Sequence, residues 1–193
     1  SEMYPDGFAT FVEVQSEMPR QLCGKTRPIH FRGVATVVCK LMNIALPDRA
    51  YFGQKDAQQL AVIRQMVSDL NMPVKVVGCP IVREADGLAK SSRNTYLNEQ
   101  ERAAALVLSR SLAEGRKLLE DGSTDADQVM ARVEEVIKSE PLARIDYVQA
   151  VNADTIEPVH KVEGTVLFAI AVYIGKTRLI DNFYWTAEES HAN

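Results

Sequence analysis

The feature that most constrains the fold is a strand, a glycine turn, a helix and a second strand within residues 49–77. The first strand is expected at 49–52, ending at Gly53, and the second at 74–77. Apolar residues at helical spacing lie between them, and Asn71 ends the helix. Asp56 and Gln59 match a capping box at the start of this helix. A strand–helix–strand unit of this length predicts two parallel strands, so this region is part of a parallel sheet.

The remainder of the first 80 residues has a mixed pattern. A strand is expected at 8–14, which is rich in Phe, Thr and Val, and a polar loop at 15–31. Apolar residues from Val34 to Ala45 then recur at three- and four-residue spacing, which predicts a helix that ends before Pro47.

The pattern changes after Cys79-Pro80, so we predict one domain over 1–80 and a second over 81–193. The second begins with an irregular polar stretch, 81–97. Asn98 and Glu101 form a capping box that opens a long helix to about Leu119, closed by Gly122. Another helix is expected to start at Ser123 or Thr124. Three strands follow, at 145–151, 165–174 and 177–183, the last two joined by a tight hairpin at 175–176. This order predicts a small α+β domain.

Composition excludes several classes of protein. Lys and Arg total 22 against 26 Asp and Glu, which gives a net charge of −4 and argues against a nucleic-acid binder. Because 46% of the residues are hydrophobic and the net charge is small, a disordered chain is excluded. The longest apolar run, 166–174, is about half the roughly 20 residues that a membrane span needs. The chain shows no signal peptide, and its three distant cysteines indicate reduced thiols with no zinc site, so we expect a cytoplasmic protein.

Two segments carry cations where a phosphate could bind. Lys55 lies where a parallel strand ends and a helix begins, a place that favours anions. The spacing alone favours the other interpretation, a plain turn with an exposed lysine and a capping aspartate. Residues 90–94 place two serines between Lys90 and Arg93, which could clamp phosphates or form a solvated loop.

A third segment places a histidine between two arginines. Arg27, His30 and Arg32 precede or open the helix predicted around Val34. They could hold a carboxylate or a phosphate, or they could be surface cations beside a helix start.

Taken in order, these segments resemble one family, the pantothenate synthetases (pantoate–β-alanine ligases). The resemblance covers essentially the whole chain and rests on six motifs: M-Y-P-D-G at 3–7, R-P-x-H-F-x-G at 27–33, F-G-x-K-D-x-Q-Q-L at 52–60, V-R-E-x-D-G-L-A at 82–89, S-S-R-N at 91–94 and R-L-I-D-N at 178–182. Such an ordered set is far more specific than any one of its members.

The resemblance implies a fold, a reaction and two cofactors. The fold would be part of a Rossmann-like nucleotidyltransferase domain with a parallel sheet, followed by a small α+β C-terminal domain. In the reaction, pantoate attacks the α-phosphorus of ATP to give pantoyl adenylate and pyrophosphate, with Mg²⁺ assisting, and β-alanine then displaces AMP to give pantothenate. No covalent enzyme nucleophile is needed, in agreement with the absence of a credible Ser-His-Asp or Cys-His set.

The resemblance also implies roles for individual residues. Gln59 would bind pantoate, Arg27 and His30 would lie near the substrates, and Val82 would contact the adenine side. Lys55, Ser91, Ser92 and Arg93 would be the catalytic group, with Lys55 and Arg93 stabilising the departing pyrophosphate. Residues 90–93 match a mobile loop analogous to the K-M-S-K-S loop of class I aminoacyl-tRNA synthetases. The ATP site would be lined by Gly53, Gln54, Lys55, Asp56, Val82, Lys90, Ser91, Ser92 and Arg93.

The chain departs from the family pattern at four points. It contains no H-x-G-H motif, which in the family lies upstream of all six motifs. Ile29 stands where Gly is usual, Lys90 where Met or Leu is usual, and Gln54 where Glu is commoner.

We therefore expect a C-terminal fragment of a pantothenate synthetase, inactive or nearly so by itself. By family likeness we also expect a homodimer. Two alternatives stay open: a related adenylate-forming ligase for another hydroxy acid, and a non-catalytic nucleotide-binding or interaction module.

Overall fold

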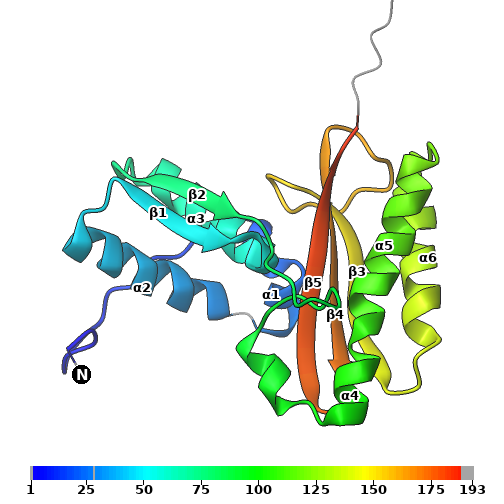
Figure 1. Cartoon of the computed structure of the whole chain (residues 1–193). Helices are drawn as coiled ribbons and strands as arrows, with labels where there is room; N and C mark the ends of the chain where they lie inside the picture. The colour runs from blue at the N-terminus through cyan, green and yellow to red at the C-terminus, as the bar shows by residue number, and fades with distance from the viewer. Residues whose placement is uncertain (1, 28, 188–193) are drawn as a thin grey trace, which may run out of the picture. The chain divides into compact units, whose positions relative to one another are not determined.

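Two small sheets organise the structure, a computed structural model that describes residues 2–27 and 29–187. One sheet has two parallel strands in the order β1-β2, and the other has three antiparallel strands in the order β3-β4-β5. The chain divides into two compact units, Ser1–Pro80 and Ile81–Asn193, each holding one sheet (Figure 1). The predicted mixed α/β class is confirmed.

The strand–helix–strand unit predicted at 49–77 is present. Strand β1 (Arg49–Gly53) pairs in parallel with β2 (Lys75–Cys79), and α3 (Ala57–Asp69) connects them through the short 3-10 turn η2 (Gln54–Asp56). Asn71 ends the helix as expected, because it takes a left-handed backbone conformation (φ 49°). The amides of Asn71 and Met72 then bond back to the carbonyls of Ser68 and Val67, at 3.2 and 3.0 Å.

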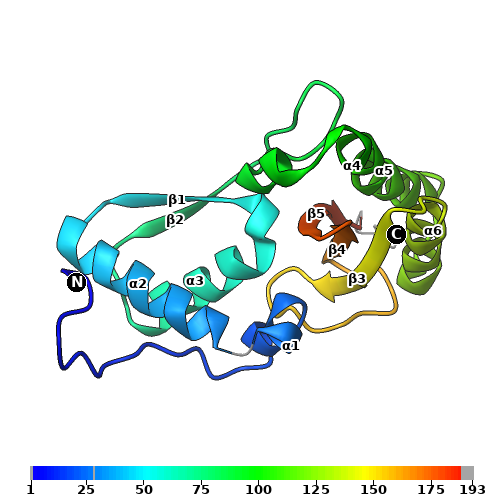
Figure 2. The same ribbon diagram turned by 90° about the horizontal axis from the view of Figure 1, so that it is seen from below.

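Two helices cover one face of this parallel pair. Helix α2 (His30–Ala45) packs beside α3, and Figure 2 shows both on the same side of β1 and β2. Their shared core is formed by Ala35, Met42, Ile63 and Met66, packed against the strand residues Ala50, Phe52 and Val76. Helix α2 ends at Ala45, just before Leu46-Pro47, as predicted.

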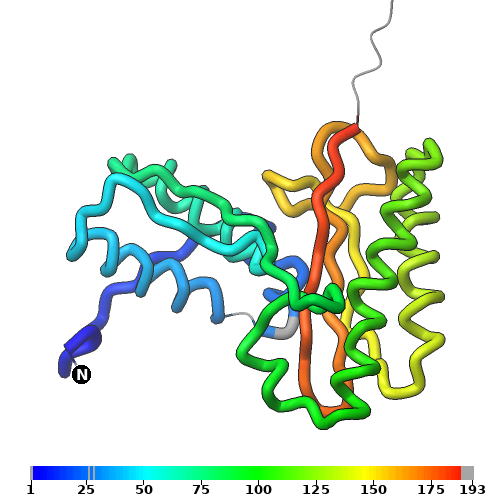
Figure 3. The backbone as a smooth tube through the Cα atoms, in the orientation of Figure 1, coloured from blue at the N-terminus to red at the C-terminus, as the bar shows by residue number. Residues whose placement is uncertain are grey.

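The strand predicted at 8–14 is wrong, because the structure shows no regular element there. In Figure 3 the segment runs as an irregular tube. The Val12 amide donates to the hydroxyl of Thr36 on α2, at 3.0 Å, instead of to a neighbouring strand. A β-strand needs a partner for its backbone groups, and the described residues offer this segment a helix instead.

The loop predicted at 15–31 is also wrong in part, because it contains two short helical turns and the start of α2. These turns are η1 (Met18–Arg20) and α1 (Cys23–Thr26). Gly24 makes the packing possible, since a Cβ there would overlap the carbonyl of Pro19. Pro28 lies outside the described residues.

The second unit is an antiparallel sheet covered by a pair of helices. Strands β3 (Ala143–Asn152), β4 (Thr165–Ile174) and β5 (Thr177–Thr186) pair in sequence order, and the predicted hairpin at 175–176 is confirmed by the pairing of Ile174 with Thr177. Helices α5 (Leu106–Glu120) and α6 (Ala126–Lys138) lie on one face of this sheet. The core between them includes Leu108, Leu112, Val129, Val133, Phe168 and Ile170.

The helices of this unit differ in detail from the prediction. The capping box of Asn98 and Glu101 is confirmed, but the helix it opens, α4 (Glu99–Ala104), stops at the buried Ala105 and α5 begins afresh. The chain tightens there, because the Leu108 amide bonds to the carbonyl of Ala105 at 3.2 Å. Gly122 closes α5 with φ 96°, as expected.

The start predicted for the next helix at Ser123 or Thr124 is wrong by two or three residues, because α6 begins at Ala126. Asp125 is the N-cap of α6, and its side chain accepts a hydrogen bond from the Gln128 amide at 3.0 Å. Ser123 supports this cap from outside the helix, because its hydroxyl bonds the side chain of Gln128 at 2.9 Å.

Candidate functional site

The first candidate segment forms the turn at the carboxyl end of β1. Gly53 is the last residue of the strand, Gln54 and Lys55 lie in η2, and Asp56 precedes α3. The side chains of Gln54 and Lys55 are half-buried and both take part in polar interactions, whereas Asp56 is exposed. This is the edge of a parallel sheet at which ligands of α/β proteins bind.

The capping box predicted for Asp56 and Gln59 is wrong. The backbone of Asp56 (φ −92°, ψ 58°) is non-helical, but its side chain makes no capping hydrogen bond within the described residues. An uncapped helix start has backbone amides available to an acceptor from outside the helix. Lys55 lies directly before the N-terminus of α3, a position that suits a phosphate group.

The glycines of this region have different roles. A Cβ at Gly53 would meet nothing within 4 Å, so the space beside the end of β1 is open. On the neighbouring strand, a Cβ at Gly78 would lie 2.9 Å from the Leu60 side chain and 3.4 Å from that of Gln54. Gly78 thus permits α3 and the η2 turn to approach β2 closely, a role that sequence reasoning missed.

Sequence reasoning also missed Gln58, which anchors the chain before α2. Its side chain is buried, and its amide nitrogen donates to the carbonyls of Met18 and Gln21 at 2.9 and 2.6 Å. Its amide oxygen accepts from the backbone of Cys23 at 3.1 Å. The neighbouring Gln59, the residue expected to bind pantoate, is half-buried. The sequence signal for a separate role of Gln58 was its place beside Gln59, since adjacent residues of a helix point in different directions.

The structure brings Arg27 and His30 together at the start of α2. The His30 amide donates to the carbonyl of Arg27 at 3.0 Å, and the imidazole packs edge-on against Phe31. Ile29 between them is exposed and has φ −94°, a conformation that any residue adopts, so the chain needs no glycine there.

In the second unit, residues 82–90 form a short hairpin that holds the other candidate segment. The Lys90 amide donates to the carbonyl of Val82 and the Glu84 amide to that of Leu88, at 2.9 and 2.8 Å. Gly87 makes the turn with φ 94°. Leu88 and Ala89 are buried, whereas Val82 and Lys90 are exposed. The hairpin is therefore fixed by its apolar side and presents Lys90 to solvent.

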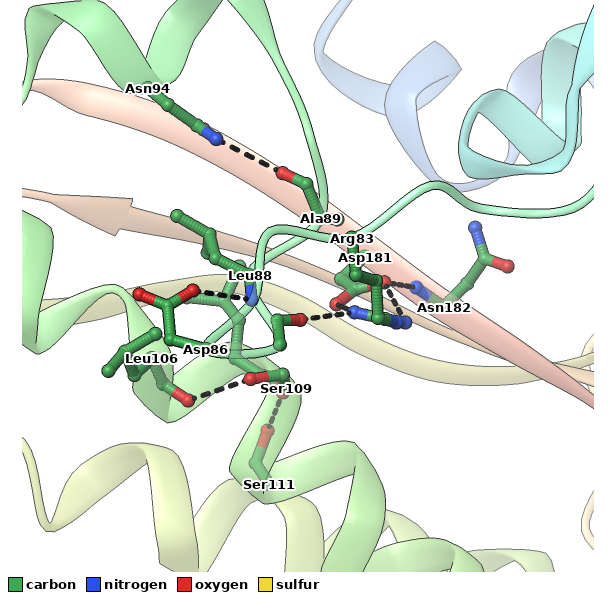
Figure 4. A network of polar contacts seen from close by, with 12 residues as sticks. Arg83, Asp86, Leu88, Ala89, Asn94, Leu106, Ser109, Ser111, Asp181 and Asn182 are labelled. Carbon is green, nitrogen blue, oxygen red and sulfur yellow. Dashed lines mark hydrogen bonds and ion pairs between the residues drawn. The ribbon is translucent and has the colours of Figure 1, made fainter.

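The serines and Arg93 continue directly from this hairpin into the 3-10 helix η3 (Ser92–Tyr96). Ser91 is its N-cap, and the Ser91 hydroxyl accepts from the Arg93 amide at 3.2 Å. Asn94 ties η3 back to the hairpin, because its side-chain nitrogen donates to the carbonyl of Ala89 at 3.2 Å (Figure 4). The exposed side chains of Lys90, Ser92 and Arg93 lie on this framework.

An acidic residue at the turn of the hairpin is held as a carboxylate. Asp86 accepts from the Leu88 amide at 3.3 Å and from the guanidinium of Arg102 on α4 at 2.8 Å. Partial desolvation acts to raise the pKa of Asp86, but these two hydrogen bonds outweigh it and the pKa lies below its ordinary value. The turn is thus linked to the start of the helical layer at neutral pH.

Two motifs that the sequence places far apart meet at this hairpin. Arg83 forms a bidentate pair with Asp181 on β5, at 2.7 and 3.0 Å, and Figure 4 shows both beside the hairpin. Both residues belong to motifs that carry the family resemblance, but sequence reasoning did not predict their contact. The two cationic segments themselves belong to different units, with Lys55 in the first and 90–93 in the second.

The described residues contain no group of three or more His, Cys, Asp or Glu side chains that could hold a metal ion. Among the same residues, no helix is both long enough and apolar enough to cross a membrane.

Comparison with known proteins places this α/β chain in a family of ligases. Residues 1–184 match the family described as Pantoate-beta-alanine ligase, and the chain belongs to that family. A curated pantothenate synthetase of Heliobacterium modesticaldum is 62% identical over 94% of the chain. The chain spans 64% of the length of that relative.

Solved structures support the same assignment. The pantothenate synthetase of Thermus thermophilus superposes with a TM-score of 0.90 at 44% identity, covering 94% of this chain and 66% of the other. The pantoate-beta-alanine ligase of Francisella tularensis, complexed with beta-gamma ATP and beta-alanine, superposes with a TM-score of 0.69 at 33% identity. The match covers 94% of this chain and 60% of the ligase chain.

Proposed function

We propose that the protein encoded by the complete gene condenses pantoate with β-alanine at the expense of ATP. A carboxylate oxygen of pantoate attacks the α-phosphorus, which releases pyrophosphate and forms pantoyl adenylate. The amine of β-alanine then attacks the activated carbonyl carbon, which releases AMP and forms the amide of pantothenate. The observation that carries this proposal is the 62% identity to a curated pantothenate synthetase across 94% of the chain.

The residues present suit a reaction among anions. Both steps develop negative charge on phosphate oxygens, so fixed cations and backbone donors lower the barrier. We assign Lys55 and Arg93 to the departing pyrophosphate, with Ser91 and Ser92 as further donors, and Gln59, Arg27 and His30 to the pantoate side. The remaining nucleotide contacts are assigned to Gly53, Gln54, Asp56, Val82 and Lys90.

We also propose that Mg²⁺ enters bound to ATP. Magnesium in nucleotide sites is commonly held by the phosphates, by water and by one or two carboxylates. The scattered acidic side chains of the described residues fit that arrangement better than a dedicated protein cage. The ion would neutralise charge on the phosphates, while the lysines and arginines of the chain orient them.

The test is pyrophosphate release by the protein expressed from its complete gene. Release is expected to require ATP and pantoate together, and AMP to appear only when β-alanine is added. Lys55→Ala should lower the first step on the order of 10²-fold or more. Lys75→Ala is the matched control, because Lys75 is an exposed lysine at the opposite end of the same sheet and should leave the rate unchanged.

Each alternative predicts a distinct result. A ligase for another hydroxy acid would release pyrophosphate with that acid and not with pantoate. A nucleotide-binding module would bind ATP without releasing pyrophosphate from it, and Lys55→Ala would then change affinity alone. Either result would overturn the proposal.

We propose finally that the protein is a cytoplasmic homodimer. Leu41, Ile44, Leu46 and Tyr51 are exposed on the first unit, which supports association through that unit. Sedimentation velocity of the gene-encoded protein should show a species of twice the chain mass. A monomer at micromolar concentration would contradict this.

A further inference from the structure

A buried carboxylate in β5 has no place among the residues assigned to the reaction. The Asp181 side chain is 1% exposed. It accepts two hydrogen bonds from the guanidinium of Arg83 and a third from the Asn182 amide at 2.8 Å. Such a pair is weak evidence for stability, because desolvating two charges offsets most of their attraction. Its directional geometry, in contrast, fixes position strongly.

The pair fixes the hairpin that leads into the cationic segment. Besides Asp181, the Arg83 guanidinium donates to the carbonyl of Gly87 at 3.0 Å, so one side chain links β5 to the turn of the hairpin. Arg83 is also adjacent to Val82, whose carbonyl accepts from the Lys90 amide. A displacement of Arg83 therefore displaces both strands of the hairpin.

The hairpin is in turn connected to the segment that carries the two serines and Arg93. Ala89 pairs across the hairpin with Arg83, and its carbonyl accepts from the side chain of Asn94 in η3. The Asn94 amide in turn donates to the carbonyl of Ser91 at 3.1 Å. Hydrogen bonds thus join Asp181 to Arg83, the two sides of the hairpin to each other, and Ala89 to Asn94; Figure 4 shows the first and the last of these links.

We propose that Asp181 is a positioning residue for the ligase reaction. Through Arg83 it holds the hairpin 82–90 in one place on β5, and so it places the Lys90 and Arg93 cations and the two serines where the phosphates react. This inference rests on the proposed function, since it assigns a purpose to the same cationic segment. Asp181 itself need touch no substrate.

The test compares two Asp–Arg pairs of the second unit, each with a mostly buried carboxylate, in the gene-encoded protein. Asp181→Asn removes the charge at nearly constant shape. Asp146→Asn is the matched control, because Asp146 accepts from Arg178 at 2.7 and 2.9 Å and the two side chains are only 17% and 15% exposed. These two hydrogen bonds join β3 to β5, whereas those of Asp181 join β5 to the hairpin.

We expect Asp181→Asn to lower kcat/KM for ATP on the order of 10²-fold while KM for pantoate changes by less than about twofold. Asp146→Asn should leave both constants unchanged at temperatures where the variant is folded. In hydrogen exchange, the amides of 84–94 should lose protection in Asp181→Asn and keep it in Asp146→Asn. Arg83→Gln should reproduce the Asp181→Asn result, and the double variant should be no worse than either single variant.

Several results would overturn the inference. One is an equal loss of activity in Asp181→Asn and Asp146→Asn, which would indicate a general effect of stability. Another is an unchanged exchange rate at 84–94 in Asp181→Asn. If Asp181→Asn does not fold, the double variant Asp181→Asn/Arg83→Gln decides, because it leaves neither charge of the pair without its partner. If the unaltered protein releases no pyrophosphate with pantoate, the proposed function fails, and hydrogen exchange still decides whether Asp181 holds the hairpin.

Discussion

Replacing Gly115 by alanine sets two opposing effects against each other where α5 crosses α6. A Cβ at Gly115 would lie 2.6 Å from a methyl carbon of Val133 and 3.2 Å from one of Val129. Both valines are fully buried, and their branched side chains have little rotational freedom. The methyl group should favour the helix by about 1 kcal/mol but cost about 1–3 kcal/mol in overpacking. We therefore expect Gly115→Ala to lower the free energy of unfolding by about 1 kcal/mol.

Gly33 in α2 is the matched control for this substitution. A Cβ there would meet nothing within 4 Å, so Gly33→Ala should gain the helix propensity of about 1 kcal/mol with no offset. Both residues are glycines inside helices without positive φ, so they differ in packing rather than in backbone geometry.

The assay uses the single tryptophan of the chain. Trp185 lies in β5 and packs against the core that contains Val133, so its fluorescence during urea denaturation reports the unit that holds Gly115. Far-UV circular dichroism follows Gly33→Ala. The double variant Gly115→Ala/Val133→Ala should be more stable than the two single changes predict by about 1 kcal/mol, because the valine methyl groups are gone. A stabilised Gly115→Ala protein, or an additive double variant, would refute the packing argument.

Three further predictions concern stability. The hydrogen bond and charge of Arg132 hold the pKa of Glu114 below its ordinary 4.5, so this pair stabilises the fold above that pH and the contribution is lost as the pH falls through the lower folded pKa. The urea midpoint should therefore fall less steeply between pH 6 and pH 3 in Glu114→Gln than in the unaltered protein. Parallel curves for the two proteins would contradict this. Gln58→Leu removes the donor to two backbone carbonyls and should cost about 1–3 kcal/mol, with faster proteolysis at 18–23 than in the unaltered protein. Asn98→Ala should cost about 1 kcal/mol by loss of the capping box, and an unchanged thermal midpoint would show that the cap contributes nothing.

Local signals made the regular elements predictable. The strands and helix of 49–77, the hairpin at 175–176 and the cap at Asn98 all depend on residues within a few positions of one another. Their spacing records the side-chain period of each element, and caps and turns require particular residue types. The family resemblance was likewise carried by short motifs whose residues stand in order.

Non-local contacts explain two of the differences between the predicted and the observed structure. The segment 8–14 has strand composition, but whether it forms a strand depends on a partner that composition does not specify. The pairing of Arg83 with Asp181 joins residues 98 positions apart, and opposite charges in two motifs were its only signal. The missing cap at Asp56 shows that a matching pair of residue types does not ensure the geometry.

The separation of Arg83 from Asp181 also has a consequence for biosynthesis. Domains fold while the ribosome is still synthesising the chain, and synthesis proceeds at about 5–20 residues per second. The 98 positions between the two residues therefore correspond to roughly 5–20 s during which Arg83 has emerged and Asp181 has not. Because β5 is the last of the described strands, the cationic hairpin acquires its anchor only after β3 and β4 have been synthesised. A nascent chain would accordingly present an 82–97 segment without its anchor on β5 to chaperones and proteases until that moment.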